Sequence, residues 1–163
     1  MDGRSRNPPT RPLVLIVDPQ EDTRAMYGLM LSMSGFDVVV TSDGVEGLRR
    51  ALEVSPDVIV TDLPVPNYDG RAFLRELQDD PRTRATPVVA VSGRLQRSLR
   101  ERVEQDGFAA CFPKPLMPYE LAAGLREILD GNGHSTSSRR DLDSWSAAVP
   151  IVHRVRRRSD GTI

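Results

Sequence analysis

Cysteine and histidine are scarce in this sequence. Cys111 is the only cysteine in 163 residues, so the chain cannot form an internal disulfide. The chain therefore also lacks the paired thiolates that most structural zinc sites use. The two histidines, His134 and His153, both lie in a polar stretch near the carboxyl terminus. A disulfide framework and a cysteine-based zinc site are excluded.

Long apolar runs are also missing. The longest unbroken runs hold about six apolar residues, far below the ~20 that a transmembrane helix needs. The stretch from Met1 to Pro12 is polar and rich in proline, without an apolar segment of signal-peptide length. The net charge of −1 gives no reason to expect nucleic acid as a partner. We therefore expect a cytoplasmic protein without a membrane segment.

Lysine is nearly absent as well. All but one of the 22 basic residues are arginine, and the exception is Lys114. Genomic base composition can account for a bias toward arginine. A single remaining lysine nevertheless suggests a position that requires a compact ammonium, because a guanidinium is broad and planar.

The composition divides the chain into three segments. Residues 12–130 carry regular apolar patterns and are expected to form one domain, preceded by a disordered arm at 1–11. From Gly131 the periodicity is lost and turn-forming residues dominate, so 131–163 is expected to be a polar, arginine-containing, disordered tail. A basic run such as the one at 153–158 is more often solvated than bound, and we expect no nucleic-acid binding there.

Short apolar runs alternate with segments of helical spacing inside the domain. The expected strands are 13–17, 36–41, 58–61, 87–91 and 108–112. Several are almost continuous in β-branched or large apolar residues, which is typical of parallel strands covered on both faces. Five strands that alternate with five helices predict an α/β domain with a parallel sheet.

Three of the expected helices carry local signals. Asp43, with Glu46 three residues later, predicts the start of the second helix. The fourth helix, at 94–106, has a thin apolar stripe among arginines and should be weakly held. In the first helix we interpret one stripe as facing the core, formed by Ala25, Met26, Leu29, Met30 and Met33.

Polar residues follow four of the expected strands. Asp18, Asp62, Ser92 and Lys114 each stand at or just after a strand end. In an open parallel sheet, ligands bind beyond the carboxyl ends of the strands, so these side chains should share one cleft. Two carboxylates, a hydroxyl and an ammonium suit a phosphoryl group with Mg²⁺. Asp18 alone would also fit as a helix N-cap with Pro19 at the first helical position, and Asp62 alone as a turn residue.

These residues closely resemble the receiver domain of two-component response regulators, over about Leu13 to Leu129. The segments that carry the resemblance are Leu15-Ile16-Val17-Asp18, Pro56 to Asp62, Pro66 with Asp69-Gly70, Pro87 to Ser92, and Lys114-Pro115. The resemblance implies a doubly wound, flavodoxin-like sheet of five parallel strands in the order 2-1-3-4-5. It also implies a signalling module rather than an enzyme.

The resemblance implies a role for each site residue. Asp62 would accept a phosphoryl group from a histidine kinase or phosphotransfer protein. Asp18, Asp62 and the backbone carbonyl of Pro64 would bind Mg²⁺, and Ser92 and Lys114 would contact the phosphoryl oxygens. The bond between Lys114 and Pro115 is typically cis in this family.

The resemblance also implies how such a domain signals. Only the short tail follows Asp130, so we expect a single-domain regulator. The face made by the fourth helix, fifth strand and fifth helix would dock an unidentified downstream protein or a second copy of the chain.

Three positions depart from the family pattern. Pro19 stands where a second metal-binding acid is usual, which should weaken Mg²⁺ binding. Cys111 replaces the aromatic switch residue, and Phe112, one residue later, should face away because strand side chains alternate. Pro64 stiffens the loop beside Asp62.

These departures leave an alternative open. The chain could be a degenerate receiver that acts as a phosphorylation-independent interaction module. An aspartate-nucleophile phosphatase is disfavoured because Pro64 stands where its second carboxylate would be needed.

Overall fold

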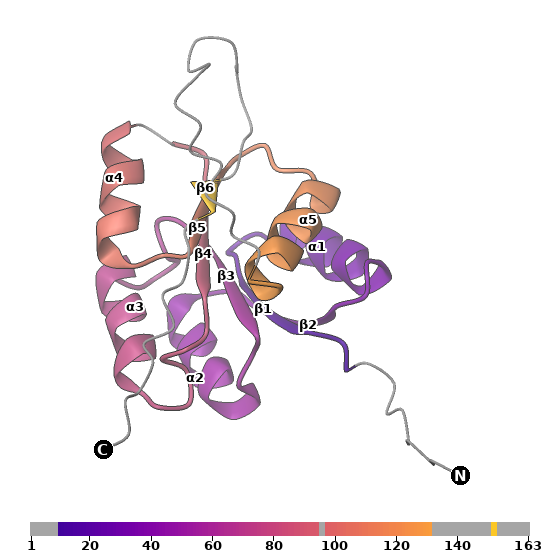
Figure 1. The fold of residues 1–163 in the computed structure, drawn as a ribbon, viewed down its shortest axis with the longest axis horizontal. Coiled ribbons are helices and arrows are strands. Elements are labelled where there is room, and N and C mark those ends of the chain that lie inside the picture. Colours follow the sequence, from indigo (N-terminus) through magenta and orange to yellow (C-terminus); the bar gives the residue numbers. More distant parts are fainter. Residues whose placement is uncertain (1–9, 95–96, 132–150, 153–163) are drawn as a thin grey trace.

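The computed structural model describes residues 10–94, 97–131 and 151–152. The predicted arm up to residue 9, both histidines and the basic run of the tail lie outside them. Strands and helices alternate in the described part (Figure 1). They are β1 (Leu13–Val17), α1 (Glu21–Met33), β2 (Asp37–Thr41), α2 (Gly44–Val54), β3 (Val58–Asp62), α3 (Gly70–Asp79), β4 (Val88–Ser92), α4 (Arg97–Asp106), β5 (Ala110–Pro113), α5 (Pro118–Leu129) and β6 (Ile151–Val152).

The sheet has the order β2-β1-β3-β4-β5-β6. Its first five strands run parallel, which confirms the predicted order 2-1-3-4-5. Figure 1 shows α1 and α5 on one face of the sheet and α2, α3 and α4 on the other. The sixth strand was not expected: Ile151 and Val152 pair antiparallel with Cys111 and Ala110 at the β5 edge.

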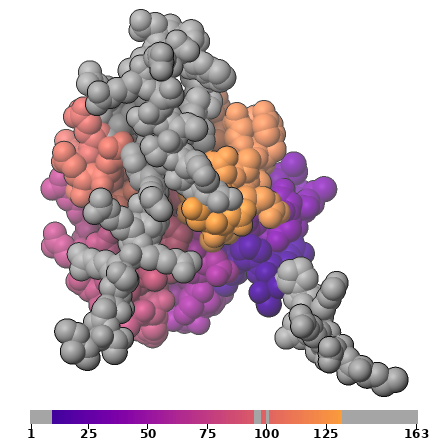
Figure 2. Space-filling view, viewed as in Figure 1, coloured from indigo at the N-terminus to yellow at the C-terminus, as the bar shows by residue number. Residues whose placement is uncertain are grey.

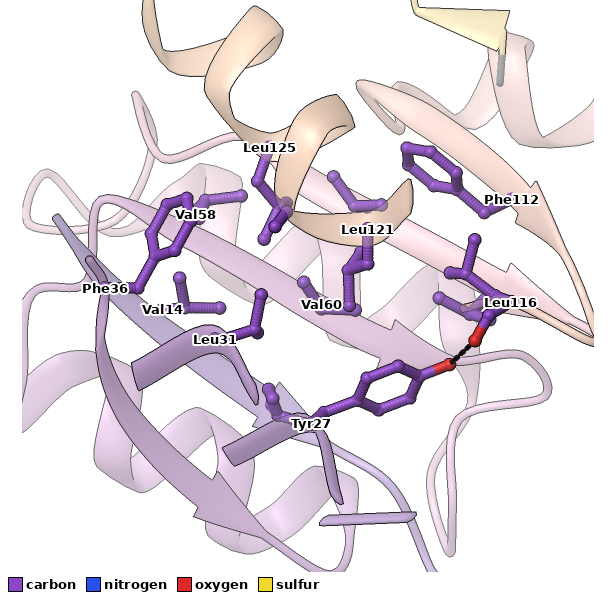
Figure 3. Close-up of a cluster of buried hydrophobic side chains, with 14 of the residues drawn as sticks. Val14, Tyr27, Leu31, Phe36, Val58, Val60, Phe112, Leu116, Leu121 and Leu125 are labelled. Carbon is purple, nitrogen blue, oxygen red and sulfur yellow. Dashed lines mark hydrogen bonds between the residues drawn. The ribbon is translucent and has the colours of Figure 1, made fainter. Parts of the chain in front are cut away.

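Two apolar cores flank the sheet. Strand β1 contributes to both, because Val14 and Ile16 face α1 and α5 while Leu15 and Val17 face the other helices. This two-sided burial explains why the strand reads as an unbroken apolar run. Figure 3 shows the core beneath α1 and α5, where Leu31 and Leu125 meet the strands.

Strand β5 follows the same alternation. Cys111 is buried on the side of α2, α3 and α4, whereas Phe112 packs under α5 against Gly124. The expectation that Phe112 faces away from the switch position is confirmed. The aromatic ring therefore belongs to the α1–α5 core.

The starts of two helices test the capping predictions. Asp43 caps α2 as expected, and its carboxylate accepts a hydrogen bond from the Glu46 N–H at 2.9 Å. The N-cap prediction for Asp18 was wrong, because α1 begins at Glu21 with Gln20 as its N-cap. The Asp18 carboxylate instead accepts a hydrogen bond from the Gln20 N–H at 2.8 Å, which holds it in the loop after β1.

The predicted core stripe of α1 was also wrong. All five of its residues are exposed, with Leu29 at 63% and Met33 at 74%. Tyr27 and Leu31, one turn apart, are the residues of α1 that are buried against the sheet. The helix has two apolar faces. The face that packs inward contains Tyr27, whose hydroxyl finds a hydrogen-bond partner there.

Candidate functional site

Four strand ends meet at one edge of the sheet. Asp18 follows β1, Asp62 ends β3, Ser92 ends β4 and Lys114 follows β5. These strands are consecutive neighbours in the sheet, so their parallel direction delivers all four residues to the same edge. The sequence pattern pointed to this arrangement because each buried strand is followed by a polar residue.

Lys114 contacts both carboxylates. Its Nζ lies 2.7 Å from Asp62 Oδ1 and 3.9 Å from Asp18 Oδ2. The backbone fixes where this side chain begins, because the Lys114 N–H donates to the Ser92 carbonyl at 2.9 Å. The structure thus brings together the ammonium and the two acids that the sequence singled out.

Ser92 lies beside this cluster on the neighbouring strand. It is buried, with 1% of its surface exposed. Its hydroxyl oxygen accepts a hydrogen bond from the Arg94 N–H at 3.2 Å, and that bond uses an oxygen lone pair and not the hydroxyl proton. Ser92 can therefore still donate to an anion at the strand ends.

The carboxyl group of Asp18 is electrostatically perturbed. Burial raises its pKa, and the negative charge of Asp62 acts in the same direction. The Gln20 N–H, Lys114 and Arg24 oppose this rise in pKa, and Arg24 also donates to the Asp18 carbonyl at 2.8 Å. A desolvated carboxylate beside a second carboxylate favours a bound cation.

The oxygen atoms at this edge can be compared with the ligands that Mg²⁺ prefers. Mg²⁺ commonly binds one or two carboxylates and completes its coordination shell with water. Asp18 and Asp62 supply the carboxylates, and the Pro64 carbonyl follows two residues after Asp62. Pro19 supplies no side-chain donor, and within the described residues no group of three His, Cys, Asp or Glu could hold a metal ion. The donors fit Mg²⁺ with one carboxylate fewer than the family resemblance implied.

Two proline peptide bonds border the site. Both Leu63–Pro64 and Lys114–Pro115 are cis. The second agrees with what the resemblance implied. The Lys114–Pro115 bond includes the site lysine, and the Leu63–Pro64 bond follows one residue after Asp62.

One residue near the site was missed by the sequence reasoning. Tyr27 of α1 is buried, and its hydroxyl donates to the Leu116 carbonyl at 2.8 Å, two residues after Lys114 (Figure 3). The helical pattern drew attention to the methionines on the opposite face of α1. The available signal in the sequence was a tyrosine within an apolar face of the helix, because a buried tyrosine hydroxyl needs a hydrogen-bond partner.

The family model described as "Response regulator receiver domain" matches residues 14–126. The chain belongs to this family. Receiver domains are signalling modules of two-component systems that in general accept a phosphoryl group, bind Mg²⁺ at the phosphorylation site and interact with histidine kinases or phosphotransfer proteins.

Two curated relatives illustrate the range of proteins that contain such a receiver domain. The polar-differentiation response regulator DivK of Brucella anthropi is 32% identical over 103 residues, which cover 63% of this chain and 84% of DivK. The hybrid signal transduction histidine kinase D of Dictyostelium discoideum is 30% identical over 119 residues. That match covers 73% of this chain but only 8% of the kinase.

Solved structures agree with the receiver fold. A response regulator from Desulfuromonas acetoxidans superposes with a TM-score of 0.67 at 27% identity, covering 72% of this chain and 96% of that one. The chemotaxis response regulator CheY4 of Vibrio cholerae gives a TM-score of 0.68 at 25% identity, covering 72% and 98%. Within the described residues of this receiver domain, no helix is long and apolar enough to cross a membrane.

Proposed function

We propose that Asp62 is the phosphoacceptor of this receiver domain, with a histidine kinase or a phosphotransfer protein as the donor. The observation that carries the proposal is the position of Lys114, whose Nζ lies 2.7 Å from Asp62 Oδ1 and within 4 Å of Asp18. An ammonium fixed at this point is placed to neutralise phosphoryl oxygens on Asp62. Asp62 is also partly exposed, so a donor can reach it.

The chemistry follows from these groups. A carboxylate oxygen of Asp62 attacks the phosphorus of a phosphohistidine that is protonated on its other ring nitrogen. A P–O bond forms as the P–N bond breaks, and the electron pair returns to the imidazole, which leaves neutral. Lys114 offsets the negative charge that spreads over the phosphoryl oxygens, and Ser92 is placed to donate a hydrogen bond to them.

Mg²⁺ would be held by Asp18, Asp62 and the Pro64 carbonyl, and when bound it would supply further positive charge to the phosphoryl group. With Pro19 in place of an acid, we expect this binding to be weak. The same substitution supports a second candidate function, a receiver that acts through contacts alone without being phosphorylated. In both cases the proposed docking surface for a downstream protein or a second copy is the face formed by α4, β5 and α5, where β6 pairs along the β5 edge. Figure 2 shows α4 and α5 at the surface of the molecule.

The experiment is phosphorylation by acetyl phosphate over a range of Mg²⁺ concentrations, followed by intact-mass measurement. We expect the full chain to gain one phosphoryl group, Asp62→Asn to gain none, and Asp79→Asn to behave like the parent chain. Asp79 is a matched control because it is exposed at the end of α3.

The variant Pro19→Asp separates the two functions. If the parent chain gains no phosphoryl group at any Mg²⁺ concentration and Pro19→Asp gains one, the contact-only function is correct. If both are phosphorylated and Pro19→Asp needs less Mg²⁺, the phosphoacceptor proposal holds and proline explains the weaker metal site.

A further inference from the structure

Tyr27 is a buried polar residue that the proposed chemistry does not use. Its ring lies in the core beneath α1 and α5, close to Leu31, Val60 and Leu121 (Figure 3). Its hydroxyl points toward the connection between β5 and α5 and donates to the Leu116 carbonyl at 2.8 Å. The tyrosine therefore links the first helix to the segment that carries Lys114.

That connection is poor in backbone donors. Pro113, Pro115 and Pro118 lack an N–H group, so half of the residues from 113 to 118 cannot donate a backbone hydrogen bond. The Lys114 N–H donates to the Ser92 carbonyl at 2.9 Å, and the Met117 N–H donates to the Glu120 carboxylate at 2.9 Å. The first of these bonds ties the segment to β4 and the second to α5.

We propose that Tyr27 is a positioning residue for Lys114, and that its hydroxyl holds the β5–α5 connection so that the ammonium stays within reach of Asp62. The proposal rests on the function proposed above. It follows from the order of contacts along the segment: Lys114 is tied to β4, Leu116 to α1 and Met117 to α5. Without the tie to α1, the segment after Lys114 keeps the packing of Leu116 in the core and the hydrogen bonds between Met117 and α5.

The ionisation of Tyr27 is consistent with this role. Burial raises the pKa of the phenol, and the negative charges of Asp18, Glu120 and Asp62 raise it further. The hydroxyl therefore remains a protonated donor at neutral pH.

A phenylalanine would fill the same volume but could not replace the bond. Leu116 is buried, with 8% of its surface exposed. In Tyr27→Phe its carbonyl would therefore lose its hydrogen-bond donor where little water can take the donor's place. Tyr27→Phe thus removes the tie and leaves the apolar packing of the ring intact. Tyr119→Phe is the matched control, because it deletes the same hydroxyl from a residue of α5 that is 66% exposed.

The test uses the full chain and begins with amide hydrogen exchange measured by NMR. In Tyr27→Phe we expect the amides of Lys114 and Met117 to exchange faster by about three- to tenfold, the range that corresponds to loss of one hydrogen bond. In Tyr119→Phe both amides should exchange as in the parent chain. Unchanged exchange at Lys114 in Tyr27→Phe would overturn the proposal. An equal acceleration at every core amide of the domain would also overturn it, because loss of global stability alone accelerates exchange throughout the domain.

A double-mutant cycle then tests whether Tyr27 acts through Lys114. Tyr27→Phe should slow phosphorylation by acetyl phosphate about three- to tenfold in the parent chain and have no further effect in a Lys114→Met background. An equal slowing in both backgrounds would contradict the proposal. If the parent chain is not phosphorylated at all, the proposed function fails, and the exchange measurement still decides the role of Tyr27.

Discussion

Lys114 Nζ and Asp62 Oδ1 lie 2.7 Å apart although their strands, β5 and β3, are separated by β4. The contact exists because both residues stand at the carboxyl ends of parallel strands and the lysine is long enough to cross the intervening strand. The only lysine of the chain is therefore the residue that contacts the proposed acceptor.

This contact predicts that arginine cannot replace Lys114. A planar guanidinium has the same charge but a different width and donor geometry, so it should displace Asp62 or the phosphoryl oxygens. We expect Lys114→Arg to slow phosphorylation by acetyl phosphate roughly tenfold or more, since misplacement by about 1 Å costs up to ~10²-fold. Arg49→Lys, on the exposed side of α2, is the control and should leave the rate unchanged. A Lys114→Arg chain as fast as the parent would show that charge alone matters.

The two apolar faces of α1 predict very different mutational costs. Leu31 is fully buried whereas Leu29, two residues earlier, is 63% exposed. Leu31→Ala should lower the free energy of unfolding by about 2–5 kcal/mol, because it leaves a cavity in the core. Leu29→Ala should change it by less than about 0.5 kcal/mol. Urea unfolding monitored by circular dichroism measures both. Equal losses would mean that the stripe predicted from the sequence is part of the core after all.

The error on α1 shows where the sequence pattern stops being informative. Spacing identifies a helix and its apolar residues, but it does not decide which of two apolar faces packs against the sheet. In the structure the inward face is the one that contains Leu31 and Tyr27, and the Tyr27 hydroxyl donates to the carbonyl of Leu116, far away in the chain. Asp18 also resembles an N-cap in sequence, but in the structure its carboxylate accepts from the Gln20 N–H and lies beside Lys114.

The polar residues at the strand ends, in contrast, could be predicted because their positions depend on a local sequence pattern. Each of β1, β3 and β4 is a short buried run whose last or next residue is polar, and in a parallel sheet this local pattern fixes the position of Asp18, Asp62 and Ser92. Strand β6 has no such signal, because two residues show no periodicity. Its pairing depends on the open edge of β5.

The close contact between Gly124 and Phe112 limits the size of the side chain that α5 can carry at position 124. A Cβ atom at this position would lie 2.8 Å from Cε1 of Phe112 and even closer to its Cζ. Gly124→Ala should therefore destabilise the domain by about 1–3 kcal/mol, in spite of the better helix propensity of alanine. Gly28→Ala is the matched control in α1, where the added Cβ meets Val40 at an ordinary 3.8 Å. That variant should be neutral or up to about 1 kcal/mol more stable.

A second substitution checks the cause of the Gly124 effect. Phe112→Leu removes the ring atoms that the new methyl group would meet. In chemical unfolding experiments, Gly124→Ala should cost less stability in a Phe112→Leu background than in the parent chain. Equal costs in the two backgrounds would place the strain elsewhere than at Phe112.

The pairing of β6 with β5 predicts protection of an otherwise open sheet edge. An edge strand exposes unpaired N–H and C=O groups, and β6 covers those near Ala110 and Cys111. Changing both Ile151 and Val152 to proline removes the two N–H groups that β6 can donate. We expect the outward-facing amide of β5 to exchange with solvent several-fold faster in this variant.

The control for this edge places the same two prolines at Ser137 and Ser138, earlier in the tail, and should leave the exchange of β5 unchanged. Mixing isotope-labelled with unlabelled chains then shows whether β6 comes from the same chain or from a second copy, since cross-strand contacts between labelled and unlabelled protons arise only between chains. If neither proline pair alters exchange at Ala110 or Cys111, β6 does not protect this edge in solution, and β5 is open to a partner strand.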